Sequence, residues 1–395
     1  MAYGNPKQAY ERLMTMMFAS MGKENKAAIE QHIAWLKGKG SNPRTVLKHL
    51  YHLQRFMVAL DKGVVLDKIT KEEVERAMAK VEESDYALET KNQIKTVLKL
   101  FYKHRQGEDE RYPKVVSWIK LSNKTRKFLP EDILSEEEVL KMLESARSDR
   151  DRAVIALLFD AGIRIGELIS LRVKDVAFGD NLSHITVNGK TGMRQIPIVF
   201  SVPYLARYFD TIKGASPSDL FWRTRNGSGA DYLDYAAALK MVKDVARRAK
   251  INKRVYPHLF RHSRASYYAN KVTEQQLKAY FGWSGSSRMA GTYVHLSGRD
   301  IDNAILGANG LKPKDEPIEP KLKIKSCARC REGNPADADY CVRCGGPLDI
   351  KVAMEAQAKE TDMKQAIVEA LKDPKAIEDI VHAYLLMQGK KGRKL

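Results

Sequence analysis

The chain has 395 residues, and its 68 Lys and Arg against 49 Asp and Glu give a formal net charge of +19 at pH 7. This length is enough for two or three domains, each with its own core. So large a positive charge argues against an ordinary soluble enzyme of small neutral substrates and favours a polyanionic partner.

Association with a membrane is not expected from the sequence. The longest apolar run, residues 153–159, is far shorter than a bilayer span and lies between Arg152 and Asp160. Docking on anionic lipid would need an amphipathic helix with exposed aromatic residues beside the charge, a pattern we do not find. The first residues also lack the basic and apolar regions of a secretion signal. We therefore expect a cytoplasmic protein without disulfides that binds nucleic acid.

Residues 1–120 have the pattern of packed helices. Asn42 is a suitable N-cap before Pro43, which fits the first helical position. Thr70 and Glu73 have the spacing of a capping box. Apolar side chains recur at helical spacing at Val46, Leu50, Leu53, Met57 and Leu60, at Val74, Ala77 and Val81, and at Ile94, Leu98 and Phe101. The pattern predicts a helical N-terminal domain.

A row of lysines follows one face of the last of these helices, with no acidic residue between them at that spacing. Its members are Lys91, Lys95, Lys99 and Lys103. Most such rows are simply solvated helix faces. In a chain this basic, contact with DNA phosphates is at least as good an interpretation.

A second domain is predicted over residues 135–309, after a basic linker at 121–134 that contains Pro130. Ser135 and Glu138 have capping-box spacing at its first helix. Residues 173–199 alternate and turn like a β-hairpin, with Lys190 at or beside its tip. The pattern predicts helices for most of the rest of the domain. Residues 310–325, which contain three prolines, then form a second linker.

All four cysteines of the chain lie in one short segment, residues 326–349. They form two CxxC pairs, Cys327 with Cys330 and Cys341 with Cys344. Two such turns can direct four sulfurs at one tetrahedral ion, so the spacing predicts a zinc ribbon. Four free buried thiols would not explain the pairing. Residues 350–395 have helical apolar spacing, and a core helix, a partner helix and a partly ordered tail all fit that pattern.

Several residues of the second domain carry chemistry, although each alone is more simply explained by structure. Arg164 fits the end of a helix, Lys190 a turn, His258 a cap after Pro257, and Trp283 a core position. Tyr293, in the segment AGTYVHLSG, would by itself be a packing residue. Their order along the chain changes this assessment.

The set resembles the tyrosine recombinases, the family of phage integrases and Xer-type proteins. That family has an arginine in a box like GxRxxEL, a lysine on a β-hairpin, an HxxR box, a His or Trp, and then a nucleophilic tyrosine. The matching positions here are Arg164 with Glu167, Lys190, His258 with Arg261, Trp283 and Tyr293. The likeness extends over roughly residues 20–308 and implies a mainly α fold with a small β-hairpin or sheet. It implies a SAM-like core-binding domain followed by the catalytic domain; the zinc ribbon lies outside this plan.

The resemblance implies a mechanism for DNA cleavage. Arg164 and Arg261 would hold the phosphate oxygens, and Trp283 would add an uncharged hydrogen bond at a position usually occupied by His. Tyr293 would attack phosphorus, with His258 as its base. Lys190 would protonate the leaving 5′ oxygen. Glu167 would support the site, and His262 would orient phosphate or partly substitute for His258.

This scheme needs neither ATP nor Mg²⁺, and zinc would be structural only. The partner implied is a double-stranded DNA attachment site, bound by a homo-oligomer, a tetramer on synapsed DNA. Segments such as GWS and YVHLSG look like archaeal integrase relatives, so integration or excision of an archaeal mobile element is the leading hypothesis. The alternatives are Xer-like resolution of chromosome dimers, relaxation of DNA like a type IB topoisomerase, and a regulator that only binds DNA. The SAM-like domain and the tail-helix segment 300–308 argue against the topoisomerase, and the presence of Tyr293 argues against the regulator.

Overall fold

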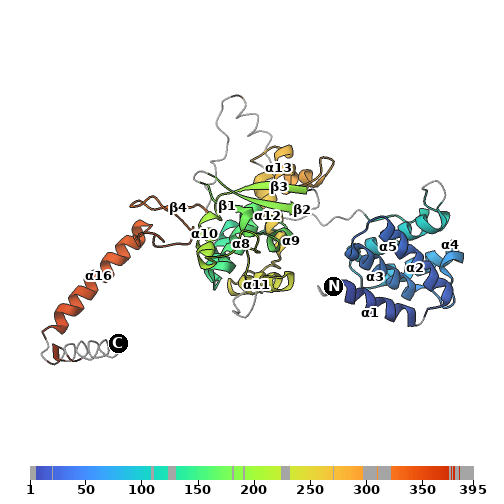
Figure 1. The fold of residues 1–395 in the computed structure, drawn as a ribbon, viewed down its shortest axis with the longest axis horizontal. Coiled ribbons are helices and arrows are strands. Elements are labelled where there is room, and N and C mark those ends of the chain that lie inside the picture. The colour runs from blue at the N-terminus through green and yellow to red at the C-terminus, as the bar shows by residue number, and fades with distance from the viewer. Residues whose placement is uncertain are drawn as a thin grey trace. The chain divides into compact units, whose positions relative to one another are not determined.

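The computed structural model describes residues 6–19, 21–107, 111–122, 130–179, 182–189, 192–223, 232–269, 271–296, 309, 322–372, 375, 377, 378 and 382. The chain divides into two compact units, residues 1–127 and 128–395 (Figure 1). The division falls within the linker predicted at 121–134, whose residues 123–129 lie outside the described part of the chain. No helix in the described part is long and apolar enough to cross a membrane.

All the regular secondary structure in the described part of unit 1 is helical. Its helices are α1 (Pro6–Ala19), α2 (Lys23–Gly38), α3 (Pro43–Ala59), α4 (Lys71–Glu83), α5 (Leu88–Gln106) and α6 (Lys114–Ser117), with a 3₁₀ turn η1 (Leu66–Lys68). The predicted caps are confirmed. The Asn42 side chain accepts from the amide of Thr45, and Thr70 and Glu73 form both hydrogen bonds of a capping box.

One apolar cluster holds unit 1 together, with Leu50, Phe56, Val74 and Phe101 fully buried. The apolar positions predicted on three helices therefore meet in one core. Met57 and Leu60 lie at its edge, since both are only partly buried.

Unit 2 combines helices with two small antiparallel sheets. Its helices and turns are η2 (Pro130–Asp132), α7 (Glu136–Ser145), α8 (Asp149–Ala161), α9 (Ile165–Ile169), η3 (Val173–Asp175), α10 (Val202–Thr211), α11 (Tyr235–Arg248), α12 (Pro257–Ala269), α13 (Glu274–Phe281), α14 (Met289–Leu296) and α16 (Ile350–Ala370). The capping box predicted at Ser135 and Glu138 is present at the start of α7.

The predicted hairpin is confirmed and lies in a three-stranded sheet. Its strands are β1 (Val176–Ala177), β2 (Ser183–Gly189) and β3 (Gly192–Ile198), in the order β1-β2-β3. Gly189, the last residue of β2, pairs with Gly192, the first residue of β3, and residues 190 and 191 between them lie outside the described residues. Gly192 has φ of 97°, a conformation that glycine adopts without the strain a side chain would bring.

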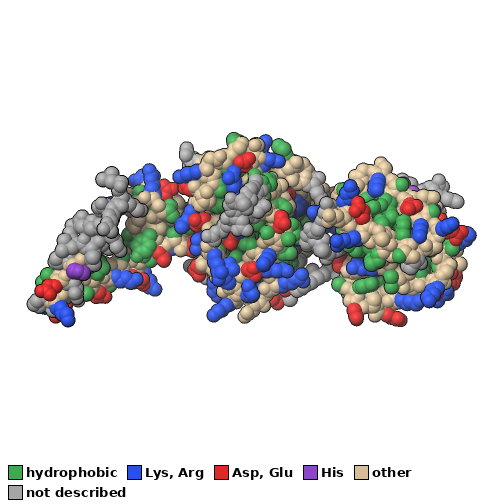
Figure 2. All heavy atoms as spheres, turned by 60° about the horizontal axis from the view of Figure 1, so that its bottom comes forward, with side chains coloured by type: hydrophobic (Ala, Val, Ile, Leu, Met, Phe, Trp, Pro, Cys, Tyr) green, Lys and Arg blue, Asp and Glu red, His purple; other side chains and the backbone are tan. Residues whose placement is uncertain are grey.

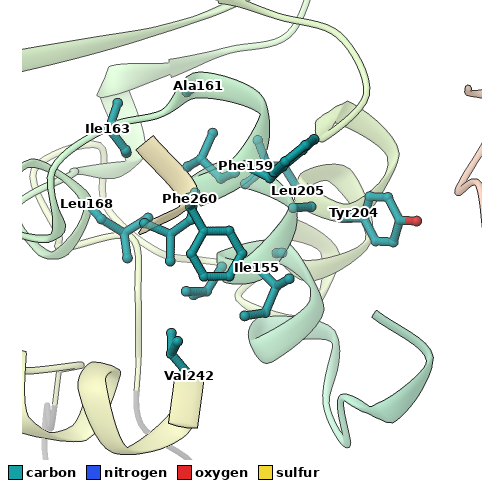
Figure 3. Packing of buried hydrophobic residues seen from close by; sticks show 14 of the residues in the cluster. Ile155, Phe159, Ala161, Ile163, Leu168, Tyr204, Leu205, Val242 and Phe260 are labelled. Atoms are coloured by element: carbon teal, nitrogen blue, oxygen red, sulfur yellow. The ribbon is translucent and has the colours of Figure 1, made fainter. Parts of the chain in front are cut away.

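The central helix of unit 2 is α8, which is buried on nearly all sides because residues 153–161 are apolar apart from Asp160. Figure 3 shows its Ile155 and Phe159 packed with Leu205 of α10, Val242 of α11 and Phe260 of α12. This packing fixes the end of α8, after which the chain enters α9, and fixes α12 beside it. Both segments carry candidate catalytic residues.

A short ribbon follows at the C-terminal side of unit 2, where β4 (Lys325–Ser326) pairs with β5 (Gly333–Asn334). It contacts α10 through Tyr204, whose hydroxyl donates to Asp337 over 2.7 Å. Helix α16 comes next and has no buried residue. Most of the second predicted linker, residues 310–321, and most of the predicted tail after residue 372 lie outside the described residues.

Candidate active site and cysteine cluster

Arg164 is positioned by the turn between α8 and α9. Gly162 ends α8 with φ of 56°, and a Cβ added there would lie 2.6 Å from the Phe281 ring. Arg164 is the N-cap of α9, and its amide donates to Glu167 Oε2 over 3.0 Å. Its Nη1 donates to Glu167 Oε1 over 2.8 Å, while 32% of the side chain remains exposed. The guanidinium is thus anchored on one side and accessible on the other.

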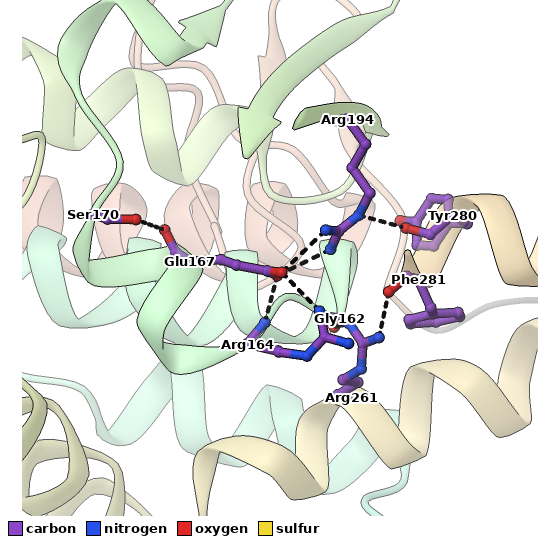
Figure 4. A network of polar contacts seen from close by, with 8 residues as sticks. All are labelled: Gly162, Arg164, Glu167, Ser170, Arg194, Arg261, Tyr280 and Phe281. Atoms are coloured by element: carbon purple, nitrogen blue, oxygen red, sulfur yellow. Dashed lines mark hydrogen bonds and ion pairs between the residues drawn. The ribbon is translucent and has the colours of Figure 1, made fainter. Parts of the chain in front are cut away.

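Glu167 is the acidic centre of the site, and its side chain is only 4% exposed. Arg194 of β3 donates two hydrogen bonds to its carboxylate, from Nη1 to Oε1 over 3.0 Å and from Nη2 to Oε2 over 2.9 Å. Burial alone would raise the pKa of Glu167, but the hydrogen bonds from Arg194 and Arg164 outweigh burial and lower it. Glu167 is therefore ionised at neutral pH and holds two arginines (Figure 4).

Arg261 of α12 lies on the other side of this network. Its Nη1 donates to the carbonyl of Gly162 over 2.9 Å, and its Nη2 donates to the carbonyl of Phe281. The residue is 2% exposed, and burial, followed by the nearby charge of Arg164, lowers its pKa to about 9. The guanidinium still carries its charge at neutral pH, now held within a poorly solvated site.

Trp283 and Tyr293 lie face to face. α13 ends at Gly282, which has φ of 59°, and Trp283 follows directly. Its ring is stacked on that of Tyr293, with 5.5 Å between centroids and 3° between planes. Tyr293, on α14, is 2% exposed, and burial raises its pKa to about 12, partly opposed by the charge of Arg261. The hydroxyl is thus protonated at neutral pH and needs a group to receive its proton.

The group that contacts this hydroxyl is His262, since its Nδ1 and the Tyr293 hydroxyl share a hydrogen bond. Burial lowers the pKa of His262 to about 4, so the ring is neutral at pH 7. His258 lies one ring further away, perpendicular to His262 with 4.7 Å between centroids, and burial lowers its pKa too. The neighbour expected from the sequence was His258; in the structure it is His262.

The structure therefore brings together Arg164, Glu167, His258, Arg261, His262, Trp283 and Tyr293. Lys190, the remaining predicted member, lies outside the described residues; its neighbours Gly189 and Gly192 end β2 and begin β3. Arg194 was not foreseen from the sequence. Its only sequence signal is its place in the strand after the hairpin loop, which does not reveal that its side chain reaches Glu167.

Each lysine of the row on α5 is partly buried and contacts its own unit. Lys91 donates to the carbonyl of Glu82, and Lys95 pairs with the Glu82 carboxylate over 2.6 Å. Lys99 and Lys103 lie over the ring of Tyr112, with Nζ 4.5 Å and 5.6 Å from its centroid.

A more exposed cationic row occurs on α11 in unit 2. Lys240, Lys243 and Arg247 recur there at helical spacing, and all three are exposed. Figure 2 shows that Lys and Arg side chains gather on the face of unit 2 that it presents. This row was not identified from the sequence, although charged residues at helical spacing are typical of an exposed helix face.

The four cysteines converge as their spacing predicts. Their sulfurs lie within 4.8 Å of one another, with Cys327 Sγ 3.6 Å from Cys344 Sγ and Cys330 Sγ 3.5 Å from Cys341 Sγ. Four sulfurs at about 2.3 Å from a tetrahedral zinc would be roughly 3.8 Å apart, so these positions are close to those that a metal such as zinc requires.

Comparisons with known proteins agree with this geometry. The phage integrase family matches residues 132–299, a range that contains every residue from Arg164 to Tyr293 in the candidate site. The tyrosine recombinase XerA of Pyrococcus horikoshii is 30% identical over 246 residues, which cover 62% of this chain and 80% of the relative. The chain belongs to the tyrosine recombinase family, and it is a site-specific recombinase that cleaves and rejoins DNA strands.

Solved structures with low sequence identity show the same fold. The integrase of transposon Tn1549, in complex with transposon right end DNA, gives a TM-score of 0.56 at 17% identity, over 72% of this chain and 98% of that one. The lambda integrase tetramer bound to a Holliday junction gives a TM-score of 0.54 at 16% identity, over 69% of this chain and 78% of that one.

Proposed function

We propose that Tyr293 is the nucleophile of this recombinase. The observation that carries this is the hydrogen bond between its hydroxyl and His262 Nδ1, beside the buried cation Arg261. Tyr293 Oη attacks the phosphorus, and the bond between phosphorus and the 5′ oxygen breaks. The products are a 3′-phosphotyrosyl linkage and a free 5′ hydroxyl. Because the linkage keeps the energy of the ester, a 5′ hydroxyl from another strand can reverse the step.

His262 receives the tyrosine proton in this scheme, since it is neutral at pH 7 and already in contact with the hydroxyl. His258 packs against His262 and is the alternative base. Lys190 gives a proton to the leaving 5′ oxygen, a role that rests on its position in the sequence, directly after the last residue of β2.

Arg164 and Arg261 balance the charge that develops on the non-bridging oxygens. Arg164 offers the exposed side of its guanidinium, while Arg261 is pinned by two carbonyls and is preorganised. Trp283 adds its indole N–H and supports the Tyr293 ring through stacking. No ATP or Mg²⁺ enters the scheme, because every charge and proton is handled by a side chain.

The test uses a nicked duplex whose sequence is first selected from random-sequence DNA on immobilised Tyr293→Phe protein. Wild-type protein should form a covalent adduct with this duplex in magnesium-free buffer containing EDTA, and Tyr293→Phe should form none. An adduct that persists in Tyr293→Phe would refute the assignment.

We propose that Cys327, Cys330, Cys341 and Cys344 hold one structural zinc, making residues 326–349 a zinc ribbon. The support is the convergence of four sulfurs within 4.8 Å. Metal analysis should find one zinc per chain and none after Cys327→Ser with Cys344→Ser. A truncation at Gly310 should cleave DNA at a similar rate while binding or assembling less well, because no candidate catalytic residue follows Tyr293. A metal-free wild-type chain would contradict the proposal.

We propose further that unit 1 is a SAM-like core-binding domain, that the lysine row on α5 contacts DNA, and that four copies act on two synapsed duplexes. The lambda integrase tetramer on a Holliday junction supports the last point by similarity of fold. For the biological role, we propose integration or excision of an archaeal mobile element. The similarity to a transposon integrase favours it, whereas the similarity to XerA favours resolution of chromosome dimers. An attachment-like repeat overlapping a tRNA gene beside the gene would decide for integration.

A further inference from the structure

Arg194 belongs to neither of the sequence boxes that define the site, yet it is the most connected cation in it. Its side chain is 12% exposed. Besides the paired contact to Glu167, its Nε donates to the carbonyl of Tyr280 over 3.2 Å. Arg194 thus joins three segments distant in sequence: the hairpin, α9 and the end of α13 (Figure 4).

Two glycines leave room for this guanidinium. A Cβ at Gly189 would lie 2.6 Å from Glu167 Oε1 and 3.1 Å from Arg194 Nη1. A Cβ at Gly282 would lie within 2.9 to 3.1 Å of the Arg194 guanidinium atoms. Side chains at either position would displace the ion pair. The backbone at these two glycines therefore fits closely around the Arg194 guanidinium. A salt bridge at the protein surface would not need such a close fit.

The sharing of Glu167 explains what this close fit achieves. Oε1 accepts from Nη1 of both Arg194 and Arg164, and Oε2 accepts from Arg194 Nη2 and the Arg164 amide. Among the described residues, the Arg164 guanidinium has one hydrogen-bond partner, Glu167 Oε1. Without Arg194, the buried carboxylate of Glu167 would have Arg164 as its one cationic partner. Both carboxylate oxygens would then be best paired by two hydrogen bonds from the Arg164 guanidinium. Arg164 would then turn its donors away from the phosphate.

We propose that Arg194 is a positioning residue: by occupying Glu167 it keeps the Arg164 donors available to the scissile phosphate. This rests on the proposed roles of Tyr293 and Arg164. It makes Arg194 necessary for cleavage although it does not touch DNA. It also links strand β3 to the arginine that binds the phosphate, through the carboxylate of Glu167.

The first test compares Arg194→Gln with wild type on the selected nicked duplex and on the same duplex with a methylphosphonate at the cleaved position. A misplaced Arg164 should slow cleavage of normal DNA by about 100-fold. The methylphosphonate is uncharged and depends less on Arg164, so the defects of both Arg194→Gln and Arg164→Ala should shrink on it. Arg264→Gln, which breaks the buried ion pair with Asp160 in the same unit, is the matched control and should show the same defect on both duplexes.

The second test asks whether Glu167 transmits the defect. Removing its charge removes the reason for it to capture Arg164, so Glu167→Gln combined with Arg194→Gln should cleave faster than Arg194→Gln alone. Adding Arg194→Gln to Arg164→Ala should not slow cleavage any further than Arg164→Ala alone. A defect of equal size on both duplexes, or no gain from Glu167→Gln, would overturn the proposal. Absence of any adduct in wild type would instead refute the role of Tyr293.

Discussion

Both units bury histidines, and the two groups are alike in electrostatics but not in surroundings. In unit 1, His32 Nε2 lies 3.2 Å from His49 Nδ1, beside the aromatic rings of Trp35 and Phe101. Burial, followed by the charge of His49, lowers the pKa of His32 to about 3, and burial lowers that of His49 to about 4. In unit 2, burial likewise lowers the pKa of His262 to about 4, but its ring contacts a tyrosine hydroxyl.

The comparison shows that a strongly lowered pKa does not by itself mark a catalytic histidine. Among the described residues, His32 Nδ1 and His52 Nε2 are buried without a hydrogen-bond partner, which is a cost to the fold. His262 instead contacts a group that has a proton to lose, next to the phosphate-binding candidate Arg261. Function is decided by the neighbouring nucleophile and cations rather than by burial.

The largest expected effect is on the rate of adduct formation when the buried histidines are replaced one at a time. His262→Ala should slow adduct formation by roughly 10²- to 10⁴-fold, the range for a lost general base, and His258→Ala should slow it less. His32→Phe should leave the rate at saturating DNA unchanged, because the ring lies in the other unit's core. Single-turnover adduct formation measures all three. If His258→Ala is the slower variant, the base is the one expected from the sequence.

The next effect concerns the proton that the leaving 5′ oxygen receives. Lys190→Ala should be slower by roughly 100-fold on normal DNA, with little change in binding. A duplex with sulfur in place of the bridging 5′ oxygen needs no proton for its leaving group, so Lys190→Ala should approach wild type on it. Arg261→Ala should stay defective on both duplexes, since it acts on the non-bridging oxygens. A lack of rescue by sulfur would make Lys190 a phosphate ligand.

A smaller effect concerns the stability of unit 1 in acid. The folded-state pKa values of His32, His49 and His52 are about 3, 4 and 4, whereas an unfolded histidine titrates near 6.5. Between these values the unfolded chain binds more protons, so stability is complete above about pH 6.5 and is lost as the pH falls toward 4. Hydrogen exchange, corrected for its intrinsic pH dependence, should show unit 1 opening in this window. His32→Phe should weaken that dependence, and an unchanged dependence would contradict this view.

The smallest effect tests the two cationic rows. If the lysines on α5 bind phosphate, changing all four to Gln should flatten the slope of log affinity against log salt by about 0.9 per contact. These lysines must exchange contacts with Glu82 and Tyr112 for phosphate, so the exposed row on α11 is a useful comparison. Fluorescence titrations of the two sets of variants give the slopes. An unchanged slope for the α5 variants would remove that row from the DNA interface.

Local features of the fold could be predicted from the sequence because their causes are local. Asn42, Thr70 and Ser135 cap helices through residues three positions away, and the cysteines converge because each CxxC is one turn. Arg164, Arg261 and Tyr293 were found through the spacing of family motifs. The contact of His262 with Tyr293 and the two hydrogen bonds from Arg194 to Glu167 were not predicted from the sequence. They span 31 and 27 residues and depend on how α12 meets α14 and how β3 meets α9.

The central claim is that Tyr293 becomes covalently joined to a DNA 3′ phosphate. The most direct measurement is to trap wild-type protein on the selected nicked duplex, digest the adduct with nuclease and protease, and locate the modified peptide by mass spectrometry. We predict a nucleotide attached through its 3′ phosphate to Tyr293, within the peptide that follows Arg288. A nucleotide on any other residue, or one attached through a 5′ phosphate, would contradict the account.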